Sequence, residues 1–175
     1  VKLNQNESPF ALPRAIEEAI RERVDLRRAN RYPEPQPRAL IAALSRQQSW
    51  PEAGILVGHG SNELGHLLAL CLLHERGKVV VPRPMFSLYE QVFRLHEADI
   101  LTVQPQSDYR FDIDAMVAAI RTHQPQLTVV TTPNNPTGLV VSPADLRRLA
   151  EASSGYLLVD EAYVEFNPHG GANAL

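Results

Sequence analysis

Five short apolar segments with little polar alternation most strongly constrain how this chain can fold. They are rich in Val, Ile and Leu and span residues 55–57, 78–81, 99–103, 127–130 and 156–160. Strands buried on both faces have this continuous apolar pattern, which is typical of a mostly parallel sheet. Helical patterns lie before and between them, at residues 12–23, 37–48, 62–75, 86–97, 112–124 and 142–152. This alternation predicts an α/β fold with a mostly parallel sheet and helices on both faces.

The composition excludes several other classes of protein. The 175 residues carry a formal net charge of −3, which gives no reason to expect nucleic acid or a membrane surface as a partner. The longest apolar run, residues 67–73, is too short to cross a bilayer, and the six histidines show no metal-ligand spacing. The single cysteine, Cys71, is expected in the core among leucines, and the lack of a disulfide framework fits the cytoplasm.

Polar or glycine-containing turns follow four of the five predicted strands. Their sequences are GHGSNE (58–63), PRPMFSLY (82–89), TTPNNPTG (131–138) and DEAY (160–163). The carboxyl ends of parallel strands meet at one edge of a sheet, which is where ligands bind in open α/β folds. We therefore expect the four turns to form one site, although each alone has an ordinary explanation as a helix cap, a tight turn or a salt bridge.

The first of these turns can bind a phosphate group. Gly58 and Gly60 let the backbone bend tightly, and Ser61 and Asn62 can cap the helix that follows. The N–H groups at the start of that helix form an anion site, and a phosphate is its natural occupant. The glycine spacing does not match the dinucleotide-binding fingerprint GxGxxG.

The other three turns offer groups that suit a planar ring. Asp160 ends a hydrophobic strand and needs a partner, because an unpaired buried carboxylate is costly, and a protonated ring nitrogen would supply one. Phe86 could stack on such a ring, while Asn135 and Tyr163 could contact a phenolic oxygen. A phosphate, a ring, a ring nitrogen and a phenolic oxygen together describe pyridoxal 5′-phosphate, whose ring nitrogen Asp160 would keep protonated.

These motifs resemble those of the fold-type I pyridoxal-phosphate aminotransferases, and within that group most of all the histidinol-phosphate aminotransferases. Besides the four turns, LNQNESPF (3–10) resembles the family's opening motif, RYPEP (31–35) its YPDP motif, and VDEAYVEF (159–166) the segment around the ring-nitrogen carboxylate. The matches follow the family order and cover essentially the whole chain. Ser8 and Met85 depart from the family pattern, which has Asn and Thr there.

The resemblance implies a role for each matching residue. The cofactor-binding residues would be Ser61, Asn62, Glu63, Phe86, Asn135, Asp160 and Tyr163, with Asp160 and Tyr163 also catalytic. Tyr32 would reach the cofactor phosphate of a neighbouring subunit, which implies a homodimer with shared active sites. Asn6, Glu7 and Tyr89 would line the substrate side.

The same resemblance predicts the domain organisation. Residues 1–30 would form an N-terminal arm with part of a small domain, and residues 31–175 the first part of an incomplete large, cofactor-binding domain. The family's Schiff-base lysine follows the DEAY strand, but the only lysines here are Lys2 and Lys78. We therefore expect the chain to be about half of a family member, with the C-terminal remainder absent, and to be inactive alone.

The implied function is an aminotransferase of histidine biosynthesis that moves the amino group of histidinol phosphate to 2-oxoglutarate, forming glutamate. A threonine-phosphate decarboxylase remains an alternative, because its sequences look very similar and the arginines that would separate the two are expected beyond residue 175. A second alternative is an inactive fragment that serves only as a binding module. The set formed by the phosphate turn, Phe86, Asn135 and Asp160 argues against that alternative.

Overall fold

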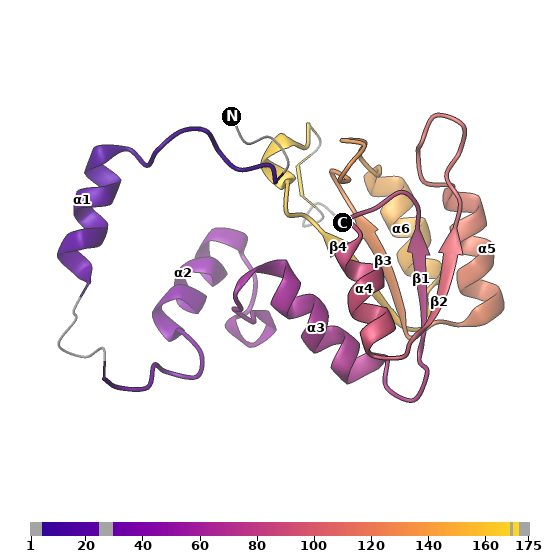
Figure 1. Cartoon of the computed structure of the whole chain (residues 1–175), viewed down its shortest axis with the longest axis horizontal. Coiled ribbons are helices and arrows are strands. Elements are labelled where there is room, and N and C mark those ends of the chain that lie inside the picture. Colours follow the sequence, from indigo (N-terminus) through magenta and orange to yellow (C-terminus); the bar gives the residue numbers. More distant parts are fainter. Residues whose placement is uncertain (1–4, 25–29, 169, 172–175) are drawn as a thin grey trace.

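The computed structural model of the protein describes residues 5–24, 30–168 and 170–171. In chain order the elements are α1 (Arg14–Arg23), α2 (Arg38–Gln48), the 3-10 helix η2 (Glu52–Gly54), α3 (Gly60–Leu72), β1 (Lys78–Pro82), α4 (Leu88–Leu95), β2 (Asp99–Val103), α5 (Ile113–His123), β3 (Leu127–Thr131), α6 (Pro143–Ala152), β4 (Tyr156–Asp160) and the 3-10 helix η3 (Val164–Phe166). The six predicted helices and four of the five predicted strands are confirmed (Figure 1). In the part of the chain that the structure describes, no helix is both long and apolar enough to span a membrane.

The four strands form one parallel sheet in the order β2-β1-β3-β4. β1 pairs with β2 along its whole length, from Lys78 opposite Asp99 to Pro82 opposite Val103. The chain runs from β1 outward to β2, and then returns to the other side of β1 for β3 and β4. The direction of winding therefore switches between β1 and β3, and in open α/β sheets ligands bind beside such a switch at the carboxyl ends of the strands.

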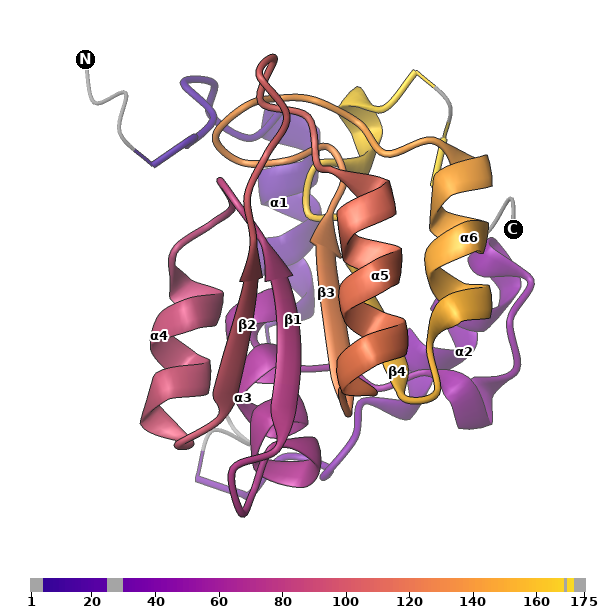
Figure 2. The same cartoon turned by 90° about the vertical axis from the view of Figure 1, so that its right-hand side faces the viewer.

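Helices cover both faces of the sheet, as the apolar pattern predicts (Figure 1, Figure 2). α3 and α4 lie on one face, and α5 and α6 lie on the other. The central strands are the most deeply buried, with all five residues of β3 and also Val79, Val80 and Val81 of β1 in the core. Among the described residues, β2 and β4 each have a neighbouring strand on one side only, and both stay partly exposed.

The predicted strand at residues 55–57 is wrong. Ile55 has an extended backbone, with φ −114° and ψ 121°, but the segment pairs with no strand in the described residues. The side-chain amide of Gln36 takes the place of a strand neighbour: its Oε1 accepts from the Val57 N–H at 3.2 Å, and its Nε2 donates to the Val57 carbonyl at 3.5 Å. The apolar composition favours an extended segment, but a strand also needs a backbone partner.

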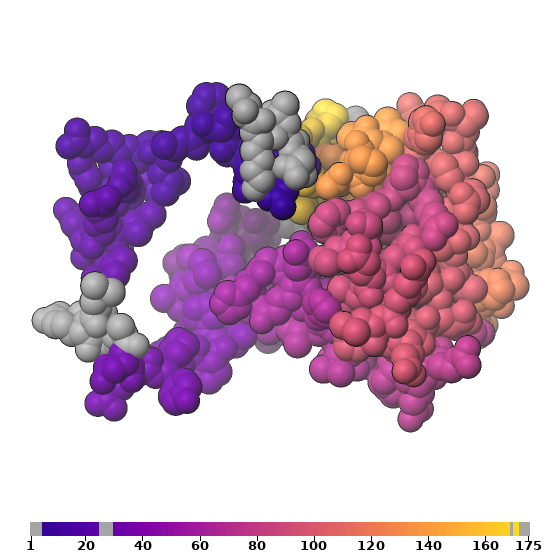
Figure 3. All heavy atoms as spheres, viewed as in Figure 1, coloured from indigo at the N-terminus to yellow at the C-terminus, as the bar shows by residue number. Residues whose placement is uncertain are grey.

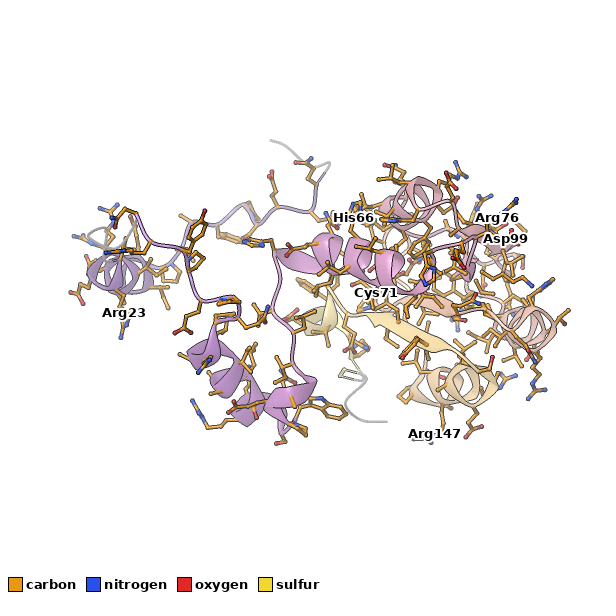
Figure 4. All side chains as sticks on the ribbon, turned by 90° about the horizontal axis from the view of Figure 1, so that it is seen from below. Arg23, His66, Cys71, Arg76, Asp99 and Arg147 are labelled. Carbon is orange, nitrogen blue, oxygen red and sulfur yellow. The ribbon has the colours of Figure 1, made fainter. Side chains whose placement is uncertain are left out.

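α3 begins at Gly60, earlier than predicted, and its apolar surface is only partly packed. Gly65 and the flanking Leu73 are buried, whereas Leu70 is exposed. Cys71 is also exposed, so its expected place in the core is wrong (Figure 4). A helix with leucine on most of its faces can bury only the face that meets the rest of the core.

α1 stands apart from the sheet and its covering helices, and Figure 3 shows open space between it and the rest of the surface. None of its residues is buried, and Ile16 and Ile20 are 51% and 48% exposed. The division into residues 1–30 and 31–175 stays a prediction. Residues 25–29, next to that boundary, lie outside the described residues.

Candidate functional site

A cavity of about 190 Å³ lies at the carboxyl edge of the sheet, where the four polar turns meet. It is lined by Ser61, Asn62, Phe86, Thr131, Pro133, Asn135, Asp160, Ala162 and Tyr163. These residues come from the start of α3 and from the ends of β1, β3 and β4 and the loops that follow them. The structure thus brings six of the predicted cofactor-binding residues together in one cavity.

The first turn of α3 lies at the wall of this cavity, which Ser61 and Asn62 line. The helix begins at Gly60, whose φ of +83° suits glycine, and the side chain of the N-cap residue His59 makes no capping hydrogen bond. Ser61 and Asn62 lie inside that turn, so the prediction that they cap the helix is wrong. First-turn N–H groups have no partner within a helix, and here they lie beside a Ser hydroxyl and an Asn amide at the cavity wall. This set of neutral donors suits an anion.

Glu63, a predicted phosphate contact, does not line the cavity. Its Oε2 accepts a hydrogen bond from the His59 N–H at 2.5 Å and lies 3.1 Å from His59 Nδ1. The backbone hydrogen bond from His59 is the main reason why the pKa of Glu63 lies below its usual value. A Cβ on Gly58 would lie 2.8 Å from the same Oε2, so a larger residue there would require the Glu63 side chain to shift. Glu63 therefore fastens the turn.

The two adjacent asparagines in the loop after β3 have different surroundings. Asn134 is buried, and its Oδ1 accepts from the Thr131 hydroxyl at 2.5 Å. Its Nδ2 donates to Thr137 Oγ1 and to the Pro84 carbonyl, at 2.9 Å each, which ties this loop to the loop after β1. Asn135 lies half-buried at the cavity wall, and its side chain has no hydrogen-bond partner among the described residues. Asn135 is thus the one available to a ligand.

Asp160 lies at the end of β4 with both carboxylate oxygens hydrogen-bonded. Oδ1 accepts from the Ala162 N–H at 2.9 Å, and Oδ2 accepts from the Tyr89 hydroxyl at 2.7 Å. The resemblance puts Tyr89 on the substrate side, but the structure buries it to 5% exposure, and it is not among the residues that line the cavity. Burial, and after it the hydrogen bond to Asp160, raises the pKa of Tyr89 well above its usual range, so the phenol keeps its proton.

The N-terminal arm reaches the edge of the cavity at Tyr163. Asn6 Nδ2 donates to the Tyr163 hydroxyl at 2.9 Å, although the two residues are 157 positions apart. Figure 1 shows the arm beside η3 before it turns towards α1. Glu7 is exposed on the same arm. Tyr32 is fully exposed on the segment before α2 and does not line the cavity.

Phe86 forms the wall of the cavity on the β1 side. It lies in the loop between β1 and α4, where Arg83 Nη2 is 2.8 Å from Glu90 Oε2 and joins the loop to the helix. The lining residues that were not predicted are Thr131, Pro133 and Ala162. Each lies inside one of the predicted turns, so the position of the turn could have indicated them, but their side chains carry no chemistry that singles them out.

A second possibility in the described part of the chain is a metal site formed by histidine and cysteine side chains. Among residues 5–24, 30–168 and 170–171, no group of three or more His, Cys, Asp or Glu side chains is placed to hold a metal ion. His66 and Cys71 both lie along α3 (Figure 4). The His66 ring meets that of His96 edge to face, with the ring centroids 6.0 Å apart. The carboxyl-edge cavity is therefore the candidate site.

Comparisons with known proteins agree with this fold. Residues 1–173 match the family described as Aminotransferase class I and II. The chain is 41% identical over 172 residues to the histidinol-phosphate aminotransferase of Chlorobium luteolum. The aligned region covers 98% of this chain and 48% of that relative. The chain spans about half the length of the curated relatives it matches.

Solved structures give the same result. One is the structure of histidinol-phosphate aminotransferase from Sinorhizobium meliloti in complex with pyridoxal-5′-phosphate, with a TM-score of 0.81 at 25% identity. The matched region covers 92% of this chain and 44% of that chain. An aspartate aminotransferase mutant from Thermus thermophilus has a TM-score of 0.80 at 27% identity, and covers 93% of this chain and 47% of that chain. These matches confirm the predicted fold-type I architecture.

Proposed function

Since the chain belongs to the aminotransferase class I and II family, we propose that the protein binds pyridoxal 5′-phosphate in the carboxyl-edge cavity and transfers the amino group of histidinol phosphate to 2-oxoglutarate. One observation carries the proposal: the cavity gathers, from four separate segments, the groups that this cofactor needs. The relative from Chlorobium luteolum, 41% identical and named for that substrate, supports the choice of amino donor.

The cavity wall fits the phosphate and the ring of the cofactor. The first turn of α3, with Ser61 and Asn62, supplies N–H, hydroxyl and amide groups for the phosphate. Phe86 supplies an aromatic face on which the ring can stack. These residues would hold the phosphate at the start of α3 and the ring beside the loop after β1.

The polar edge of the ring would meet the loops after β3 and β4. When bound, the cofactor supplies an electron sink for bond breaking at the substrate carbon. Asp160 would hold a proton on the ring nitrogen, and two hydrogen bonds fix the orientation of its carboxylate. Asn135 and Tyr163 would donate to the phenolic oxygen. Because Asn6 donates to the Tyr163 oxygen, the Tyr163 proton stays available for this contact.

No lysine lies among the described residues that line the cavity. Lys78 begins β1 at the opposite edge of the sheet, and Lys2 lies outside the described residues. The expected inactivity of the 175-residue chain alone therefore stays a prediction. Turnover is best measured on the intact natural protein.

The proposal includes a cytoplasmic homodimer with shared active sites. Tyr32 supports it, because a fully exposed phenol can reach a neighbouring subunit and its cofactor phosphate. Asn6 and Glu7 belong to the substrate side in this proposal, since their arm meets Tyr163 at the edge of the cavity.

Cofactor binding is tested by titrating the intact natural protein with pyridoxal 5′-phosphate, reducing it with borohydride and measuring the intact mass. One phosphopyridoxyl group per chain is expected, and no adduct at saturating cofactor would contradict the proposal. Asn135→Ala should weaken cofactor binding about tenfold, because a hydrogen bond to the ring oxygen is lost. Gln91→Ala, exposed on α4 and outside the cavity, is the control.

Turnover separates the proposed reaction from its alternatives. Histidinol phosphate with 2-oxoglutarate should yield glutamate. Release of carbon dioxide from threonine phosphate, without glutamate, would indicate the decarboxylase instead. Cofactor binding with neither reaction in the intact protein would indicate a binding module.

A further inference from the structure

The hydroxyl of Tyr89 contacts Asp160, which lies on the wall of the carboxyl-edge cavity. It donates to Asp160 Oδ2 at 2.7 Å, while Oδ1 accepts from the Ala162 N–H at 2.9 Å. Tyr89 is 5% exposed, and the residues that line the cavity do not include it. It therefore touches the carboxylate but does not line the carboxyl-edge cavity.

The ring of Tyr89 is buried, and it lies beside Gly65 of α3. Gly65 leaves room for the ring, since a Cβ there would lie 3.5 Å from Tyr89 Cε1. On α4, the Phe93 ring packs at a tilt of 38°, with the centroids 5.9 Å apart. In this packed position the phenol has little freedom to turn away from Asp160.

We infer that Tyr89 is a positioning residue that holds the Asp160 carboxylate in the orientation needed to pair with the ring nitrogen of pyridoxal phosphate. This inference rests on the proposed function. A carboxylate fixed at one oxygen by the backbone can still tilt about that contact, and a second donor at the other oxygen removes this freedom. Because the pKa of Tyr89 is raised by burial and by Asp160, the phenol remains a donor throughout the physiological pH range.

The test compares the cofactor affinity of four forms of the intact natural protein: wild type, Tyr89→Phe, Asp160→Asn and the double variant. Tyr89→Phe should weaken binding of pyridoxal phosphate about tenfold, since a hydrogen bond to a charged group is lost. With Asp160→Asn already present, the same change should alter the affinity less than about twofold, because Tyr89 acts through the carboxylate. Tyr156→Phe removes an exposed phenol at the opposite end of β4 and should bind like wild type.

Unchanged affinity in Tyr89→Phe overturns the inference and leaves the proposed function standing. An equal loss with and without Asp160→Asn also overturns it, because Tyr89 would then act only on the fold. A wild type that binds no cofactor overturns the proposed function and the inference together.

If Tyr89→Phe does not fold, 3-fluorotyrosine and 4-fluorophenylalanine at position 89 give the same comparison. Both keep the bulk of tyrosine, but only 3-fluorotyrosine keeps the donor. Equal affinity of these two forms overturns the inference, and a loss confined to 4-fluorophenylalanine supports it.

Discussion

The side chain of Asn134 joins two loops at the carboxyl edge of the sheet. It accepts a hydrogen bond from the Thr131 hydroxyl and donates to the Pro84 carbonyl. Its neighbour Asn135 faces the cavity instead. Pro133, just before the pair, has a fixed φ, which stiffens the loop and helps to keep the two side chains in these separate environments.

Asn134→Ala is expected to lower the free energy of unfolding by about 2 kcal/mol, because buried polar groups lose their partner. Asn135→Ala, one residue away, should change it by less than about 0.5 kcal/mol, because no hydrogen bond in the described structure is lost. Urea denaturation of the apoprotein measures both. Equal destabilisation by the two variants would contradict this division of roles.

At the scale of an element, an ion pair joins α4 to the loop after β1. Arg83 donates through Nε and Nη2 to the two carboxylate oxygens of Glu90, at 2.9 and 2.8 Å. The Glu90 side chain is 16% exposed, and its pKa lies below the usual value, chiefly because of the hydrogen bond from Arg83. Since Glu90 follows Tyr89 in α4, the ion pair also steadies the helix that carries the phenol.

Glu90→Gln should lower the free energy of unfolding by about 1 kcal/mol at neutral pH, a modest value because Arg83 is partly exposed. A carboxylate whose pKa is lowered by folding stabilises the protein at pH values above its unfolded-state pKa of about 4.3. This stabilisation is lost as the pH falls through the lower pKa of the folded state. The difference in unfolding free energy between wild type and Glu90→Gln should therefore stay constant from neutral pH down to about pH 5 and shrink below about pH 4.

The exposed Glu151 on α6 offers a control for this pH dependence. Glu151→Gln should leave the unfolding free energy almost unchanged at every pH, because no ion pair of Glu151 occurs in the described structure. A wild-type advantage over Glu90→Gln that grew in acid would show that the carboxylate is not stabilised by folding.

The whole molecule combines a packed α/β part with a thin N-terminal extension (Figure 3). The extension exposes Ile16 and Ile20 on α1, and the packed part exposes Trp50 and Leu70. Exposed apolar surface of this kind marks places that pack against another surface or cause aggregation.

Expressed alone, residues 1–175 should therefore self-associate. Replacing Ile16 and Ile20 with lysine should shift the sedimentation velocity distribution towards the monomer. Gln47→Lys with Gln91→Lys adds the same charge at exposed polar positions and should shift it less. An equal shift in both double variants would show that net charge, and not the apolar face of α1, controls association.

Much of the fold and of the site could be predicted from the sequence. Apolar runs and helical periodicity predict the four parallel strands and six helices, because near neighbours in sequence decide whether a segment can be buried on one face or two. Turn residues at the strand ends predict the edge at which Phe86, Asn135 and Asp160 meet, since parallel strands bring their carboxyl ends together. The hydrogen bonds by which Asp112 caps α5 and Ser142 caps α6 are likewise local, since each reaches a backbone N–H three residues along the chain.

Only the tertiary structure decided the features that depend on a distant partner. The segment at 55–57 is not a strand, because a side-chain amide and not a neighbouring strand meets the Val57 backbone. Glu63 turns to its own loop, and Tyr89 is buried with its hydroxyl on Asp160, 71 residues further along the chain. Periodicity and turn chemistry describe a residue and its near neighbours, whereas the direction of a side chain is settled by whatever the folded chain packs beside it.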